Sequence, residues 1–223
     1  MLIQHTNLKL EVNILRYMVI DIFKNAIGHW SFTNGTATDE TENNNDGNIN
    51  GATFLQNGGP DNKGSFVFNG SSSIEMPNFS FPSSNFCLSF WLKDDSTTED
   101  HRRWIGNSVD AFDNNLFIIR ENNNNNNVEI GIGDKVSEIP TTFKGSWTHF
   151  VLNVDYGNIA TLYINKQEIG SINISSPNFD SSMFIGGYYQ DGEYVVGEFT
   201  EIVVYDKLLS QSDIDNLYNY RIN

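Results

Sequence analysis

Carboxylate side chains are gathered in one polar stretch of the sequence, residues 36–51, which reads TATDETENNNDGNING. Its acids are Asp39, Glu40, Glu42 and Asp46. The stretch is rich in Asn and lacks hydrophobic periodicity, so we expect a loop. Ca²⁺ takes oxygen ligands, and the loop could gather its carboxylates around such a cation. The alternative is an ordinary solvated loop.

Aromatic residues stand beside polar residues in two further stretches. The first contains His101, Arg103 and Trp104, and the second contains Tyr188 and Tyr189. An aromatic face with polar neighbours, carried on loops of a rigid scaffold, is the chemistry that glycan binding uses. We therefore predict that these five residues bind the ligand. The alternative is that the tyrosines cover the edge of a sheet.

Catalytic residue types do not occur here in a catalytic spacing. Retaining glycoside hydrolysis needs two carboxylates roughly 5–5.5 Å apart. Glu198 and Glu201 are three residues apart, so in a regular strand they point to opposite faces and form no such pair. The histidines are scattered, without a serine or cysteine partner in a nucleophile motif, at His5, His29, His101 and His149. We predict that the chain is not an enzyme.

Strands must position these groups, and the clearest strands lie in residues 145–171, GSWTHFVLNVDYGNIATLYINKQEIGS. Phe150 and Leu152 alternate with residues of the opposite face, and this two-residue period is typical of a strand with one buried face. Turn residues at Gly157 and Asn165 separate three such segments. The pattern predicts a meander of three antiparallel strands that a second sheet must cover.

Other segments complete an all-β pattern with one short helix near the end. Strands are expected in residues 26–35, 64–77, 86–93, 115–134 and 198–205. In residues 86–93, alternate positions from Phe86 to Leu92 share one apolar face. A helix is expected over residues 210–218, because Ser210 is a candidate N-cap with Asp213 three residues on, close to a capping box.

The composition fits one globular domain. The chain has 223 residues, of which 39% are hydrophobic and 13% aromatic, and this permits a sizeable core. The net charge of −15 argues against binding to nucleic acid or to an anionic membrane. Cys87 is the only cysteine, which excludes an intrachain disulfide. No stretch approaches the roughly 20 apolar residues of a membrane span.

The first 25 residues are the hardest segment to interpret. Leu8, Leu10 and Val12 alternate as in a strand, although a helical stripe also fits, and the density of Val and Ile favours a strand. The segment lacks the features of a signal peptide. We divide the chain into residues 1–25, an edge strand or an arm that docks on a partner, and residues 26–223, the main domain.

Several motifs occur in the order that is typical of a known family. They are GHWSFTNG, GSFVFNGSSSIEMP, FCLSFWLKDD, the 145–171 stretch, and FIGG followed by GEFTEIVVYDKLLSQSDIDNLY. From about Ile27 to Tyr218 they resemble the laminin G-like modules of the concanavalin A-like lectin/glucanase jelly-roll superfamily. The resemblance implies a sandwich of two antiparallel sheets, with residues 64–77 as a hairpin. It also implies that Trp91 and Trp147 are core or rim residues rather than ligand platforms.

Modules of this family often hold a structural Ca²⁺ between the first polar loop and the strand near the C-terminus. Asp39 matches the loop acid and Glu201 matches an acid of that strand, but Thr200 stands where the family has an inward-facing Asp. Glu198 shares the face of Thr200 and could reach inward instead, and Asp46 is a further candidate. The resemblance thus implies a calcium site formed by Asp39, Asp46, Glu198 and Glu201.

These observations predict a non-catalytic, lectin-like recognition module that binds a glycan or a protein. We expect it outside the cell, on a cell surface or on a virion. The alternative is a structural component of a virion or surface appendage, whose other subunits would contact residues 1–25. The Asn-rich composition and the lack of a signal peptide motivate that alternative. A degenerate glycoside hydrolase is a third option.

Overall fold

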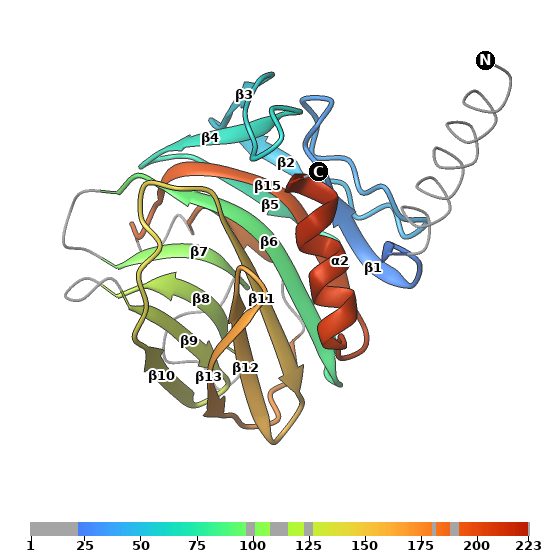
Figure 1. Cartoon of the computed structure of the whole chain (residues 1–223), viewed down its shortest axis with the longest axis vertical. Helices are drawn as coiled ribbons and strands as arrows, with labels where there is room; N and C mark the ends of the chain where they lie inside the picture. The colour runs from blue at the N-terminus through green and yellow to red at the C-terminus, as the bar shows by residue number, and fades with distance from the viewer. Residues whose placement is uncertain are drawn as a thin grey trace, which may run out of the picture.

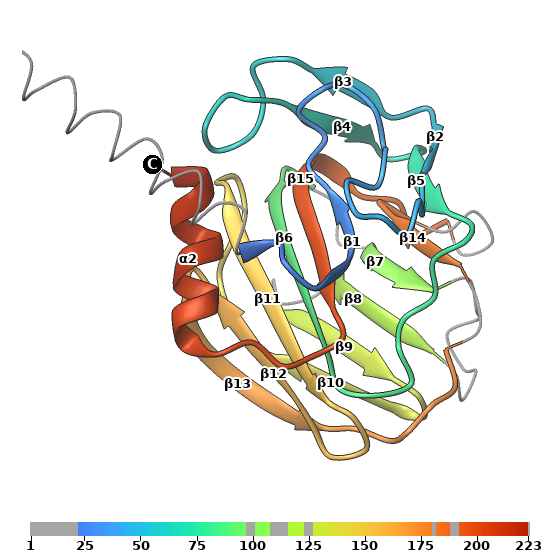
Figure 2. The same ribbon diagram turned by 90° about the vertical axis from the view of Figure 1, so that its right-hand side faces the viewer.

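The computed structural model describes residues 22–96, 101–107, 116–122, 127–179, 182–187 and 192–222. Two antiparallel sheets pack face to face over a hydrophobic core, and helix α2 (Gln211–Ile222) lies against the outer face of one sheet (Figure 1, Figure 2). This confirms the predicted all-β jelly-roll sandwich with a short C-terminal helix. Residues 1–21 of the predicted arm lie outside the described residues.

The larger sheet has eight strands, in the order β13-β12-β11-β6-β15-β4-β3, with β1 paired to β15. Its strands are β1 (Ala26–Trp30), β3 (Thr53–Leu55), β4 (Ser65–Asn69), β6 (Phe86–Asp94), β11 (Thr148–Asp155), β12 (Ile159–Ile164), β13 (Gln167–Asn173) and β15 (Val196–Tyr205). The long strands β6 and β15 pair with each other at its centre.

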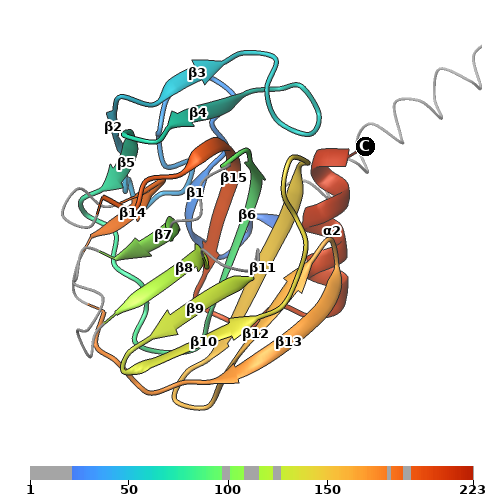
Figure 3. The ribbon, with the colours of Figure 1, turned by 90° about the vertical axis from the view of Figure 1, so that its left-hand side faces the viewer.

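The smaller sheet has seven strands, in the order β10-β9-β8-β7-β14-β5-β2 (Figure 3). Its strands are β2 (Asn48–Asn50), β5 (Ser73–Met76), β7 (Arg102–Asn107), β8 (Phe117–Glu121), β9 (Val128–Ile132), β10 (Lys135–Ile139) and β14 (Met183–Ile185). The predicted hairpin in residues 115–134 is confirmed, because β8 and β9 pair directly.

The predicted meander in residues 145–171 is also confirmed. Strand β11 pairs with β12, with Leu152 opposite Leu162, and β12 pairs with β13. The β12–β13 turn is made by Asn165 and Lys166, which have φ values of +47° and +74°. Two consecutive positive φ values are typical of the type I′ turn that suits the twist of a two-residue hairpin.

The two faces of β6 follow the predicted alternation. Phe86, Leu88, Phe90 and Leu92 lie in the core between the sheets. Cys87 belongs instead to a second apolar cluster on the outer face of the sheet, beneath α2. A two-residue period therefore divides this strand between two hydrophobic environments.

The motif in residues 64–77 does not form a hairpin, contrary to the implied family pattern. The chain turns at Gly70, with φ of +84°, but β4 pairs with β15 and β5 pairs with β14. The two strands thus belong to opposite sheets. They cross over because the aromatic residues of β4 and the apolar residues of β5 cover the same core from its two sides.

Strand β15 contains a β-bulge at Glu201. The pairing of β15 with β6 changes register between Thr200 and Val203, and Glu201 has φ of +51°. Phe199 and Ile202 both lie in the core. The two residues between them, Thr200 and Glu201, therefore share the outer face, as expected where a bulge inserts one extra residue.

This bulge shows that two predictions about β15 are wrong. Glu198 and Glu201 lie on the same face rather than on opposite faces, because the bulge breaks the alternation between them. Glu198 also does not reach inward. Its carboxylate accepts a hydrogen bond from Ser65 Oγ at 2.7 Å and lies 3.4 Å from Lys93 Nζ.

Helix α2 begins where the sequence predicts but ends four residues later. The hydroxyl of Ser210 accepts a bond from the N–H of Asp213, whose carboxylate accepts the N–H of Ser210, so the predicted cap is confirmed. The last turn is held by Arg221, which reaches the sheet through Glu201. Among the described residues, no helix has the length and apolar character that crossing a membrane requires.

Candidate functional site

The predicted ligand residues of β7 are held inside the domain. Trp104 is fully buried, and its Nε1 donates to Asp94 Oδ2 at 3.1 Å. Its ring packs against Phe143 and Phe150, with centroid distances of 4.9 and 5.0 Å. Arg103 is also fully buried. A buried indole presents no face to a ligand, so the structure places Trp104 in the scaffold.

The remaining predicted ligand residues are less constrained. His101 is half-buried, with Nε2 at 3.8 Å from Glu129 Oε2. Glu129 also pairs with Arg120, which binds Glu193 through two contacts of 2.8 Å. This ion-pair network satisfies the charges near His101. Tyr188 and Tyr189 lie outside the described residues.

The acids of the first polar loop bind N–H groups. Asp39 Oδ1 accepts the backbone N–H of His29 and of Thr41, both at 3.0 Å, and Oδ2 accepts two N–H groups of Asn45. Asp46 accepts the N–H of Asp39 at 2.8 Å. Burial raises the pKa of Asp39, but the backbone hydrogen bonds together lower it below its ordinary value.

The carboxylate of Glu201 binds the side chains of His29 and Arg221. Its Oε1 lies 2.5 Å from His29 Nε2, and its Oε2 accepts a hydrogen bond from Arg221 Nη1 at 2.8 Å. Arg221 Nη2 lies 2.8 Å from Asp61. All four groups are nearly inaccessible to solvent, with side-chain exposures of 8% or less. The guanidinium thus supplies positive charge between two buried carboxylates.

The four predicted calcium ligands do not fit one metal site in this arrangement. Both oxygens of Asp39 and both of Glu201 already accept hydrogen bonds, whereas Ca²⁺ needs six or more oxygens directed at one point. Glu198 is bound elsewhere, to Ser65 and Lys93. The described part of the chain contains no group of three or more His, Cys, Asp or Glu that could hold a metal ion.

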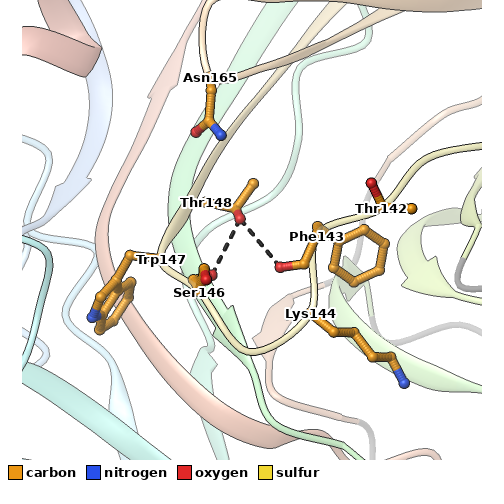
Figure 4. A pocket seen from close by; sticks show the side chains of 7 residues that line it. All are labelled: Thr142, Phe143, Lys144, Ser146, Trp147, Thr148 and Asn165. Carbon is orange, nitrogen blue, oxygen red and sulfur yellow. Dashed lines mark hydrogen bonds between the residues drawn. The ribbon is translucent and has the colours of Figure 1, made fainter.

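A pocket of about 420 Å³ lies at one end of the sandwich, where the loop before β11 meets the β12–β13 turn (Figure 4). Its lining residues are Thr142, Phe143, Lys144, Ser146, Trp147, Thr148 and Asn165. In Figure 4 the indole of Trp147 projects outward from the loop, away from Phe143 and Lys144, and the amide of Asn165 lies above Thr148. The pocket therefore combines an aromatic ring with several polar side chains.

The loop is fixed to the sandwich by short-range contacts. Phe143 is buried, and its ring meets Trp104 edge to face. Thr148 Oγ1 donates to the carbonyls of Phe143 and Ser146, at 3.3 and 3.2 Å (Figure 4). The N–H of Gly145 donates to the carbonyl of Asp94 at 2.8 Å. These bonds pre-organise the loop, which reduces the entropy lost when a ligand binds.

Asn165 is fixed from the other side. Its side-chain Oδ1 accepts the backbone N–H of His149 at 3.0 Å, and the backbone N–H of Asn165 donates to the carbonyl of His149 at 2.9 Å. The left-handed backbone of the turn suits Asn. The amide oxygen is thus engaged, and the amide nitrogen is the group of this side chain that can donate to a ligand.

Lys144 is the ionisable residue among the seven that line the pocket. Its Nζ lies 2.5 Å from Glu121 Oε1 and donates to the carbonyl of Ser96 at 2.9 Å. Glu121 belongs to β8 and is 2% exposed. Burial raises the pKa of Glu121, and the hydrogen bond from Lys144 opposes that rise.

The sequence reasoning assigned Trp147 to the core or rim and missed its place in a pocket. Trp147 is half-buried, whereas Trp91 is buried beneath α2. The alternation of β11 contained a signal for this difference. Phe150 and Leu152 face the core, so Trp147, at an odd position just before the strand begins, is out of phase with the core-facing residues.

Two antiparallel sheets over one aromatic core, with an open polar pocket at one end, define a lectin-like β-sandwich. The chain belongs to the concanavalin A-like lectin/glucanase superfamily, whose sequence model matches residues 68–215. This confirms the resemblance seen in the sequence. No curated protein sequence matches this chain.

Several solved structures are similar in fold. Domain 4 of AbnA, an extracellular GH43 arabinanase of Geobacillus stearothermophilus in complex with arabinotriose, has a TM-score of 0.67 and 23% identity, covering 87% of this chain and 98% of that domain. The binding domain of Paraclostridial Mosquitocidal Protein 1 has a TM-score of 0.69 and 19% identity, and the match covers 90% of this chain. A third structure comes from a study in which cell entry of botulinum neurotoxin type C depends on two ganglioside molecules. It has a TM-score of 0.69 and 15% identity, and the match covers 91% of this chain.

The chain covers 53% of the mosquitocidal binding domain and 52% of the neurotoxin chain. It therefore corresponds to about half of each toxin structure and to nearly the whole of the arabinanase domain. At these identities the likeness concerns the fold.

Proposed function

We propose that this chain is a non-catalytic recognition module that binds a glycan in the pocket beside Trp147. The observation that carries this proposal is the half-buried indole beside fixed polar groups in a pocket of about 420 Å³. Sugar rings offer apolar C–H faces to aromatic rings and hydroxyl groups to polar side chains. Concave sites of this size, with a few well-placed polar groups, are typical of small-ligand binding.

The similar structures support a glycan as the ligand class. The arabinanase domain is in complex with arabinotriose, and the neurotoxin study concerns gangliosides. These statements concern those proteins, and the sugar that this chain takes is part of the proposal. We also propose an extracellular or surface location, as for the arabinanase. Tyr188 and Tyr189 stay predicted ligand residues.

The absence of catalysis is supported by the bonding of the acids on β15. Glu201 is held by His29 and Arg221, and Glu198 is held by Ser65 and Lys93. Carboxylates locked in ion pairs are poorly placed to transfer a proton to a substrate. The two acids share a face but bind different partners, so they offer no free acid and base.

Trp147→Ala should weaken glycan binding about 30-fold, since a central aromatic anchor is worth roughly 2 kcal/mol. A glycan array that includes arabinotriose identifies a ligand, and calorimetry with the full chain then measures its affinity. Tyr156→Ala is the matched control, because Tyr156 is a half-buried aromatic at the opposite end of β11.

The control should bind like the wild type, and melting curves confirm that both variants are folded. Equal affinity of Trp147→Ala and wild type would place the site elsewhere. An array without any bound glycan would overturn the proposed ligand class.

A further inference from the structure

The pocket beside Trp147 has almost no net charge available to a ligand. Thr142, Ser146, Thr148 and Asn165 are neutral, and Lys144 brings the one formal charge of the lining. The ammonium of Lys144 is neutralised by Glu121 at 2.5 Å. The side chains of this pair are 29% and 3% exposed, respectively. The carboxylate therefore stays with the ammonium, and the pair presents no excess positive charge.

Lys144 also has little donor capacity left. An ammonium group has three N–H donors. One is directed at Glu121 Oε1 and another at the carbonyl of Ser96. An anionic sugar would have to compete with a buried carboxylate for this cation, and removing one partner of a buried ion pair is costly.

The charge of the whole chain acts in the same direction. At −15 it repels anions at long range and disfavours their approach to the surface. Hydroxyl groups of a neutral sugar, in contrast, can use the Asn165 amide nitrogen and the hydroxyls of Thr142 and Ser146.

Building on the proposed function, we propose that the pocket selects neutral sugars over anionic sugars, and that Glu121 determines this selectivity by neutralising Lys144. Glu121 lies behind the pocket lining and acts through Lys144. It is thus a specificity-determining residue without contact to the ligand.

Matched pairs of neutral and anionic sugars test this inference. Lactose and sialyllactose form one pair, and galactotriose and trigalacturonate form another. Wild type should prefer the neutral member of every pair that it binds. Glu121→Gln keeps the shape of the side chain and a hydrogen-bond acceptor for Lys144, but it removes the negative charge that neutralises the Lys144 ammonium. We expect it to bind the anionic member about five-fold more tightly than wild type does, the upper end for a solvent-exposed ion pair, with neutral binding unchanged.

Two further measurements identify the charge as the cause. The double variant Glu121→Gln/Lys144→Met should lose the gain, and high salt should reduce it. If Glu121→Gln does not fold, the affinity ratio of wild type for anionic over neutral sugar is measured as the pH falls, at values where circular dichroism shows the chain folded. The ratio should rise, because burial raises the pKa of Glu121 and its protonation frees the charge of Lys144.

The outcomes separate the two proposals. Equal wild-type affinity for both members of a pair, with both lost in Trp147→Ala, would overturn the selectivity and leave the proposed site in place. If wild type and Glu121→Gln prefer the neutral sugar to the same degree, although the substitution frees the charge of Lys144, the role of Glu121 is overturned. Binding that Trp147→Ala does not affect would overturn the proposed site itself.

Discussion

Replacing Arg221 with methionine should lower the free energy of unfolding by about 3–5 kcal/mol, the cost of removing one partner from a buried ion pair. The guanidinium is 1% exposed and lies 2.8 Å from both Glu201 and Asp61. Its Nη2 also donates to Thr200 Oγ1 at 3.3 Å. Methionine fills much of the volume but removes the buried cation that Glu201 and Asp61 share. Among the described residues, Glu201 then keeps only His29, and Asp61 keeps only the exposed Lys63, so the loss is electrostatic rather than a loss of packing.

Chemical denaturation at neutral pH, followed by circular dichroism, measures this effect. Lys63→Met is the matched control, because Lys63 pairs with the same Asp61 at 2.9 Å but is 58% exposed. An exposed pair contributes about 1 kcal/mol or less. The loss in the free energy of unfolding for Arg221→Lys should lie between those of Arg221→Met and Lys63→Met, since lysine keeps the charge but not the planar guanidinium. A loss in Arg221→Met no larger than that in Lys63→Met would contradict the role assigned to the buried pair.

The sequence predicts most of the sandwich because its strands are amphipathic. In β6, the residues from Phe86 to Leu92 alternate so regularly that both faces were assigned correctly. The meander of β11, β12 and β13 is specified in the same way, with Asn165 at a turn that requires positive φ. Local pattern and turn chemistry agree in these segments, and such agreement makes a prediction reliable.

The bulge at Glu201 could not be predicted from the sequence around it. Glutamate seldom adopts a φ of +51°, and no glycine marks the position. The bulge is stabilised by contacts from distant parts of the chain, namely His29 in β1 and Arg221 in α2. Because these partners lie 172 and 20 residues away, a two-residue period along β15 contains no information about them.

The candidate site was predicted less well than the fold. Residue type suggested Trp104 as a ligand platform, but exposure decides which aromatic ring a ligand can reach, and exposure depends on packing across both sheets. Trp104 is enclosed by Phe143 and Phe150, whereas Trp147 stands one residue before β11 and is only half-buried. The pairing of Lys144 with Glu121 likewise joins a loop to a strand of the other sheet.

His149 is the basis of the second large effect, a dependence of stability on pH. Its side chain lies between the larger sheet and α2, and the residue is 1% exposed. The ring stacks against Trp91 at 5.0 Å, and Nε2 is 2.8 Å from Ser89 Oγ. Its Nδ1 has no hydrogen-bond partner within the described part of the chain. Burial without a compensating anion lowers the pKa of His149 from 6.5 to about 3.

The sign of the effect follows from the proton count of each state. Between pH 6.5 and about 3 the unfolded chain protonates this histidine and the folded chain does not, so acid favours unfolding. Above pH 6.5 both states are neutral and His149 contributes no pH dependence. The loss is roughly 1.4 kcal/mol for each pH unit. It reaches about 5 kcal/mol near pH 3, where it levels off.

His149→Gln should remove this dependence, because glutamine stays neutral throughout the range. The measurement is the difference in unfolding free energy between wild type and variant at several pH values between 7.5 and 4.5. Other titrating groups are common to both chains and cancel in that difference. At pH 7.5 the difference reports packing alone, and by pH 4.5 it should have shifted in favour of the variant by about 3 kcal/mol. A difference that stays constant with pH would mean that the folded protein accepts the proton on His149, and hence that α2 does not exclude solvent from the ring.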